Sequence, residues 1–156
     1  TAVLVGAAMK MGAIVANASE SDQNGIYEFG KNLGIAFQLQ DDYLDAFGDP
    51  ETFGKQVGGD IIANKKTFLF LKAVENGTQD EAQSLMDLFS ETPEDPSEKI
   101  KRTKEIFENS GAANATIAEI EKYTNEATTI LDTIAISEDN KNKLQEFGEW
   151  LMKRTV

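Results

Sequence analysis

Residues 34–49 read GIAFQLQDDYLDAFGD, and the interpretation of the whole chain starts from this stretch. On a helix with about 100° per residue, Asp41, Asp42 and Asp45 fall on one face about 100° wide. Gln38 lies near the middle of that face. The apolar residues of the stretch point in other directions and can pack inside a bundle. The pattern predicts a largely buried helix that presents three carboxylates and an amide on one side.

Clustered carboxylates on a buried helix repel one another, so they need cations nearby. Mg²⁺ is the natural candidate, because it prefers oxygen ligands and is commonly held by one or two carboxylates together with substrate phosphates. Asp41 and Asp45 are one turn apart, so both can reach the same ion or neighbouring ions. An EF-hand is excluded, because its ligands alternate through a loop. The competing interpretation is an exposed, solvated helix face.

Composition narrows the possible functions. The chain has 156 residues and a formal net charge of -12, which argues against nucleic acid and anionic membrane surfaces as partners. Cysteine and histidine are both absent, so disulfides, thiolate metal sites, zinc sites with histidine ligands and an imidazole base are excluded. The apolar runs are too short to span a membrane. We expect a cytoplasmic protein.

An all-α fold is predicted, because there are only three prolines and strand-like alternation is missing. The main helix should run from about Gln23 to Phe47, with Ser21 or Asp22 as its cap. Residues 48–64 are glycine-rich and predict a loop with a short turn. The remaining helices of the bundle are expected at about 1–18, 65–77, 79–90, 97–109, 112–134 and 138–153.

The first of these helices should be buried and closely packed, because Gly6 and Gly12 lower its intrinsic propensity. Its apolar residues recur at helical spacing. They are Leu4, Ala7, Ala8, Met11, Ile14 and Val15.

Residues 53–66, FGKQVGGDIIANKK, follow the aspartate helix and carry several lysines in a glycine-rich connection. Lysines beside magnesium carboxylates suit a diphosphate, whose oxygens they can meet as point charges. The alternative is a solvated loop with ordinary surface lysines.

Taken together, FQLQDDYLD, GD, FGK, GGDI and NKKT resemble the second aspartate-rich region of the trans-isoprenyl diphosphate synthases. The opening TAVLVGAA is also similar to a stretch of that family. The specific resemblance covers about residues 1–75. It implies that 1–156 is the C-terminal portion of a single all-helical domain with the isoprenoid-synthase fold.

The resemblance implies that Asp41, Asp42 and Asp45 are magnesium ligands facing an allylic diphosphate. Lys55 and Lys65 match lysines that contact that diphosphate. The implied catalytic residues are therefore Asp41, Asp42, Lys55 and Lys65.

Further positions of the substrate site follow from the same resemblance. Gln38 matches a residue of the diphosphate site, and Phe37 matches one near the homoallylic substrate. Thr1 matches the threonine of a lysine–threonine pair. Asp60 matches a supporting acidic position behind the ligands.

The implied reaction is a head-to-tail condensation of an allylic diphosphate with isopentenyl diphosphate, with release of diphosphate. The family's first aspartate-rich motif and its arginine pair are missing, since Arg102 and Arg154 are the only arginines. We therefore expect a fragment that is inactive alone, whose partner is the N-terminal half of the same enzyme. The intact enzyme is expected to be a homodimer.

Other functions stay open at this point. A class I terpene cyclase shares the helical fold, but its second motif mixes other residues over a longer spacing. A second alternative is an inactive prenyl synthase subunit, although such subunits often lose these aspartates. A non-enzymatic alternative is an acidic helical scaffold that binds cations or a basic partner.

Overall fold

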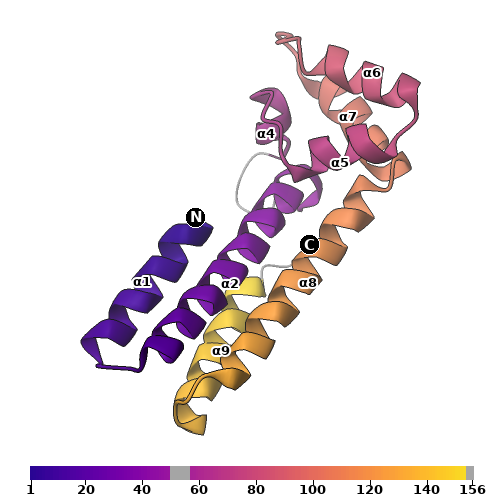
Figure 1. Cartoon of the computed structure of the whole chain (residues 1–156). Coiled ribbons are helices and arrows are strands. Elements are labelled where there is room, and N and C mark those ends of the chain that lie inside the picture. Colours follow the sequence, from indigo (N-terminus) through magenta and orange to yellow (C-terminus); the bar gives the residue numbers. More distant parts are fainter. Residues whose placement is uncertain (50–56, 154–156) are drawn as a thin grey trace. The chain divides into compact units, whose positions relative to one another are not determined.

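The computed structural model describes residues 1–49 and 57–153, and every regular element in these ranges is an α-helix (Figure 1). The helices are α1 (Ala2–Val15), α2 (Glu20–Phe47), α4 (Gly59–Ile62), α5 (Phe68–Asn76), α6 (Gln79–Leu88), α7 (Ser97–Asn109), α8 (Ala112–Thr133) and α9 (Glu138–Met152). The predicted all-α class is confirmed. None of these described helices is long and apolar enough to cross a membrane.

The aspartate helix α2 begins at Glu20, earlier than the predicted start at Gln23. The predicted caps were wrong, because Ser19 takes this role instead of Ser21 or Asp22. The Asp22 N–H donates to Ser19 Oγ at 3.1 Å, and the Ser19 hydroxyl donates to Asp22 Oδ2 at 2.6 Å. A serine three residues before an acidic residue satisfies an N–H that the first helical turn leaves unpaired.

The chain divides into two compact units, the first formed by residues 1–38 with 119–153 and the second by the described residues of 39–118. In the first unit, α1, α9 and parts of α2 and α8 surround one apolar core. Its buried members are Ile26, Phe29, Leu33, Ala127, Leu131 and Ile134.

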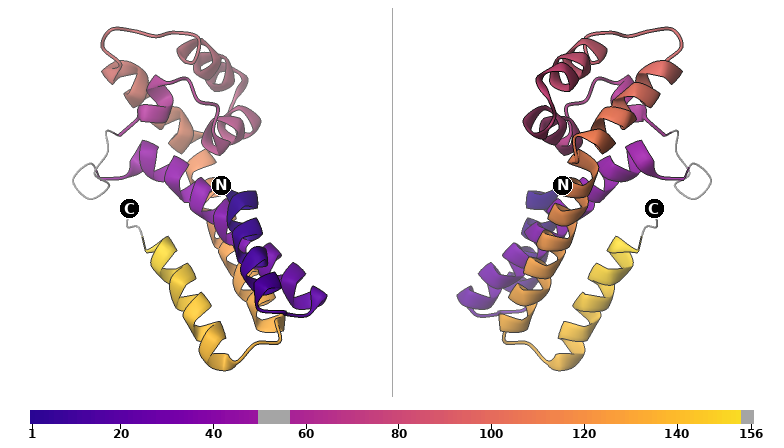
Figure 2. Two further views of the ribbon diagram at one scale, coloured as in Figure 1. Left: turned by 90° about the vertical axis from the view of Figure 1, so that its left-hand side faces the viewer. Right: turned by 90° about the vertical axis from the view of Figure 1, so that its right-hand side faces the viewer.

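Helix α1 packs closely on α2 in the first unit, and the two run side by side in each view (Figure 2). A Cβ atom at Gly6 would lie 2.7 Å from the carbonyl oxygen of Tyr27, and one at Gly34 would lie 2.7 Å from the Cα of Ala2. Only glycine permits this approach. The expected close packing is therefore confirmed at Gly6. It was wrong for Gly12, which is exposed and would meet nothing within 4 Å.

Several large apolar residues of α1 lie on its other side and are exposed. Leu4 is 73% exposed, Met11 65% and Val15 83%. The expectation that α1 is buried is thus correct for only one of its faces. Large apolar residues of other helices are also exposed, namely Met86, Ile117, Phe147 and Trp150.

In the second unit, α5, α6 and α7 pack with α4 and the end of α2 around a separate core. The buried members of this core are Ala46, Ile61, Leu69, Phe70, Ala73, Leu85, Leu88, Phe89, Ile106, Phe107 and Ala112. The short helix α4 is the turn that was predicted within the glycine-rich connection. Ile61 anchors it in the core with 2% of its surface exposed.

We expect Gly6→Ala to lower the free energy of unfolding by about 1–3 kcal/mol, the usual cost of forcing a methyl group into a close-packed contact. Gly12→Ala in the same helix is the matched control. It should raise that free energy by up to about 1 kcal/mol, because alanine is the better helix former. Urea denaturation followed by circular dichroism measures both. Equal stability of the two variants would contradict the close packing of α1 on α2.

Candidate functional site

The three aspartates of the motif lie in the last turns of α2, within the second unit. Asp42 is buried, with 8% of its surface exposed, while Asp41 and Asp45 are half-buried. Leu44 and Ala46, the residues on either side of Asp45, are buried in apolar surroundings. A charged carboxylate in such a position needs a partner that offsets its desolvation.

Lys65, in the segment after α4, supplies that partner. Its Nζ lies 2.9 Å from Oδ1 of Asp42 and 2.7 Å from Oδ2 of Asp60. Partial burial lowers the pKa of Lys65, but the hydrogen bonds to Asp60 and Asp42 and their negative charges outweigh this and raise it above its ordinary value. The ammonium group therefore stays charged at neutral pH. The structure thus brings together three of the predicted site residues.

Asp45 holds the start of α4 by a different contact. Its Oδ2 accepts the backbone N–H of Asp60 at 2.8 Å, and its carbonyl oxygen accepts the N–H of Gly58 at 2.6 Å. A Cβ atom at Gly59 would lie 3.1 Å from Asp45 Oδ1, so the glycine lets the chain pass close to the carboxylate. Burial raises the pKa of Asp45, as do the charges of Asp60 and Asp41, against the backbone hydrogen bond and Lys65. Asp45 therefore fastens α4 to α2.

The turn after α4 directs Lys65 back toward these carboxylates. Asn64 has a left-handed backbone with φ of 56°. Its N–H donates to the carbonyl oxygen of Ile61 at 3.2 Å, and the N–H of Lys65 donates to that of Asp60 at 2.9 Å. These two bonds form a Schellman motif, which reverses the chain at the end of a helix. Sequence reasoning missed Asn64, although an asparagine directly after a short apolar helix is a recognisable signal for such a turn.

Other predicted site residues lie in the first unit. The Thr1 hydroxyl donates to Oε1 of Gln38 at 2.9 Å. Phe37 borders a pocket of ≈ 440 Å³ with Trp150, Leu151 and Lys153. Lys55 lies outside the described residues.

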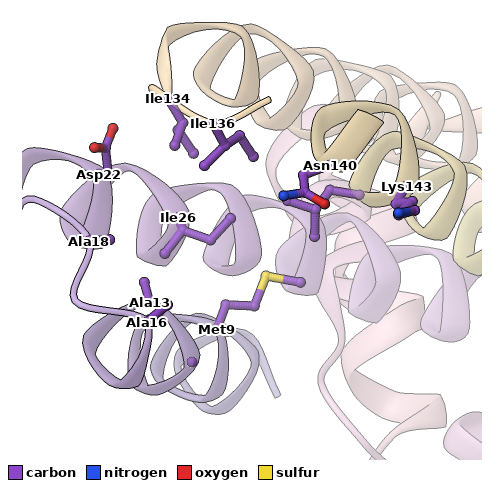
Figure 3. A pocket seen from close by; sticks show the side chains of 12 residues that line it. Met9, Ala13, Ala16, Ala18, Asp22, Ile26, Ile134, Ile136, Asn140 and Lys143 are labelled. Atoms are coloured by element: carbon purple, nitrogen blue, oxygen red, sulfur yellow. The ribbon is translucent and has the colours of Figure 1, made fainter. Parts of the chain in front are cut away.

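A second pocket of the first unit, of ≈ 400 Å³, is lined mainly by apolar side chains from α1, α2 and the region of the α8–α9 connection (Figure 3). Met9, Ile26 and Ile134 contribute apolar surface, and Asp22 and Lys143 are among its few polar side chains. None of the residues predicted to bind diphosphate or metal lines this pocket.

The donor set of the α2 aspartates is compatible with magnesium. In residues 1–49 and 57–153, no group of three or more carboxylates converges as a complete protein-only metal site. Magnesium does not require one, because it commonly takes one or two carboxylates and completes its coordination with water and substrate phosphates. Asp41, Asp42 and Asp45 offer the hard oxygen donors of such a shared site.

Comparison with known proteins places the chain in a family. The profile of the Polyprenyl synthetase family matches residues 1–109. The chain belongs to this family. A short chain isoprenyl diphosphate synthase of Methanothermobacter thermautotrophicus is 31% identical over 154 residues, which cover 99% of the chain and 46% of that protein. The chain thus spans about half the length of this relative.

Solved structures of the family share the fold. A crystal structure of geranylgeranyl pyrophosphate synthase is 48% identical with a TM-score of 0.90, and the match covers 100% of this chain and 49% of that one. A geranylgeranyl pyrophosphate synthase from Corynebacterium glutamicum, complexed with isoprenyl diphosphate and magnesium, is 27% identical with a TM-score of 0.81. That match covers 93% of this chain and 41% of the other. The predicted isoprenoid-synthase fold is therefore confirmed.

The fastening role of Asp45 makes a prediction about local opening. We expect Asp45→Ala to speed amide hydrogen exchange at Asp60 and to cost about 1–3 kcal/mol of stability, because a half-buried N–H loses its acceptor. Asp45→Asn is the matched control, since its amide oxygen can still accept that bond. Hydrogen exchange followed by NMR measures both. Similar exchange in the alanine variant and the unchanged chain would contradict this role.

Proposed function

We propose that this chain carries the magnesium- and diphosphate-binding part of a trans-prenyltransferase. The enzyme condenses an allylic diphosphate with isopentenyl diphosphate and releases diphosphate. The observation that carries the proposal is the contact of Lys65 with Asp42 and Asp60 beside two further aspartates of α2. Membership of the polyprenyl synthetase family supports the same reaction class.

In the proposed reaction, the carbon–oxygen bond of the allylic diphosphate breaks and a carbon–carbon bond forms to isopentenyl diphosphate. One proton is lost, and the released diphosphate takes it. Stabilisation of the leaving group would provide most of the catalysis, and the part of the site in this chain, which has no histidine, fits this role. Lys65, and Lys55 by resemblance, would meet the negative charge that develops on the departing diphosphate.

Lys65 has the capacity for this role. An ammonium group carries three N–H donors, and Asp42 and Asp60 account for two of them. The side chain of Lys65 is 47% exposed, so a phosphate oxygen can approach it from solvent. The two carboxylates orient the amine without enclosing it.

Asp41, Asp42 and Asp45 would hold magnesium together with the diphosphate. The metal, when bound, supplies positive charge that neutralises the leaving group. Asp60 is proposed to act behind these ligands by orienting Lys65. Gln38 is proposed to contact diphosphate, and Phe37 is proposed to lie near the homoallylic substrate. Thr1 is proposed to belong to the substrate site.

We also propose that a complete active site needs a further part of the enzyme, which corresponds to the half of the relatives that this chain does not match. The exposed apolar face of α1 fits such a partner, because contiguous apolar surface usually marks an interface. Val3 at 65% and Leu4 at 73% exposed are its first residues. The intact enzyme is proposed to be a homodimer.

Binding of inorganic diphosphate by the chain, measured by calorimetry, tests the site directly. We expect binding only with Mg²⁺ present, and a loss of affinity of about tenfold or more in Asp41→Asn, which removes one charged ligand. Asp132→Asn, an exposed aspartate on α8, is the control and should bind as the unchanged chain does. Magnesium-independent binding would contradict the metal site, and no binding would favour the acidic scaffold.

Prenyl transfer is the second test. The chain alone should yield no prenyl product from allylic and isopentenyl diphosphates, because an open site would let water quench the allylic cation. Mixing it with a polypeptide that covers the other half of the 48% identical geranylgeranyl pyrophosphate synthase should give product. Radiolabelled isopentenyl diphosphate provides the assay. Turnover by the chain alone would refute the need for a second half.

A further inference from the structure

Lys99, on α7, is a buried cation that belongs to none of the motifs above. Only 4% of its surface is exposed. Its Nζ donates to Oδ1 of Asn64 and, at 2.8 Å, to the carbonyl oxygen of Glu91. The ammonium also lies 5.6 Å from the ring centroid of Phe89. Lysine is rarely buried unless it is paired, so these contacts offset the cost of its burial.

The side chain of Asn64 is held at both of its polar ends. Its Oδ1 accepts from Lys99, and its Nδ2 donates to the carbonyl oxygen of Glu91 at 3.3 Å. Left-handed backbone is uncommon for residues other than glycine. The two side-chain contacts therefore favour one rotamer and one backbone conformation at the position where the Schellman turn reverses the chain.

Lys65 is the next residue, and its direction depends on that turn. Its backbone N–H closes the turn on Asp60, and its ammonium then reaches Asp60 and Asp42. We infer that Lys99 is a positioning residue, which directs Lys65 toward the bound diphosphate by fixing the conformation of Asn64. This inference rests on the proposed function for the role of Lys65. The link between Lys99 and Lys65 rests on the contacts alone.

Lys99→Met is the informative substitution. Methionine keeps an unbranched apolar side chain beside Phe89 but loses the donor to Asn64. If Lys99 served only the stability of the second unit, the loss would lower the melting temperature without a specific effect on Lys65. If Lys99 acts through Lys65, the two residues must be coupled energetically.

A double-mutant cycle on magnesium-dependent binding of inorganic diphosphate separates these cases. Lys99→Met should weaken binding about tenfold, as expected for a residue that orients a ligand-binding group. In the Lys65→Met background the same change should have no further effect. Lys101→Met, on the exposed side of α7, is the control and should leave binding unchanged. No weakening by Lys99→Met, or equal weakening in both backgrounds, overturns the inference.

The ¹⁵Nζ signal of Lys65 gives a readout that needs no ligand. In lysine-selective NMR spectra, the hydrogen-bonded ammonium should be observable in the unchanged chain and lost by fast exchange in Lys99→Met. If the chain binds no diphosphate, the proposed function fails, but this signal still decides the inference. Should Lys99→Met not fold, Asn64→Ala removes the same contact and should lose the signal too. A Lys65 signal that persists in the folded variant overturns the inference.

Discussion

The crowding of negative charge in the last turns of α2 is the constraint on which the site depends. Asp42 is 8% exposed, so its charge must be offset from within the protein. The Nζ atom of Lys65 lies 2.9 Å from Oδ1 of Asp42, and Lys65 reaches it from a segment well downstream in the sequence. The fold of residues 57–66 is therefore part of the site, because it brings the ammonium to the carboxylates.

The aspartates of α2 stabilise the local structure in addition to their proposed role in metal binding. Asp45 accepts the N–H of Asp60 and thereby joins α4 to α2, while Asp42 fixes the amine of Lys65. These structural contacts give the motif a role even though the described residues form no complete protein-only metal site. Carboxylates that position the polypeptide can still share a magnesium ion with a phosphate ligand, since this metal needs few protein donors.

The sequence was sufficient for the fold class, for α2 and for the expectation of a downstream lysine beside the aspartates, but the direct ion pair of Asp42 with Lys65 was not predicted. These predictions rest on helical periodicity, which is a local signal in the sequence, and on the repulsion between clustered carboxylates, which follows from their charge. The start of α2 was predicted too late in the sequence, because Ser19 was not considered as its N-cap. Periodicity defines the apolar stripe of α1 without saying what covers it, and the structure shows that Leu4, Met11 and Val15 of this stripe are exposed.

The contact of Lys99 with Asn64 lay beyond sequence reasoning for a different reason. The two residues are 35 positions apart, and each has an ordinary local context. Only tertiary packing of α7 beside the turn after α4 brings them together. Long-range polar contacts of this kind carry no periodic signal, whereas the apolar positions of the same helices do.

An NMR titration of the chain with inorganic diphosphate tests the central claim most directly, because it locates the ligand as well as detecting it. With Mg²⁺ present, the largest amide shifts should fall in residues 41–45 and 58–66, and chelation of the metal should abolish them. Shifts centred elsewhere, for example on α7, or shifts that persist without Mg²⁺, would contradict the assignment of the α2 aspartates and Lys65 to a magnesium–diphosphate site.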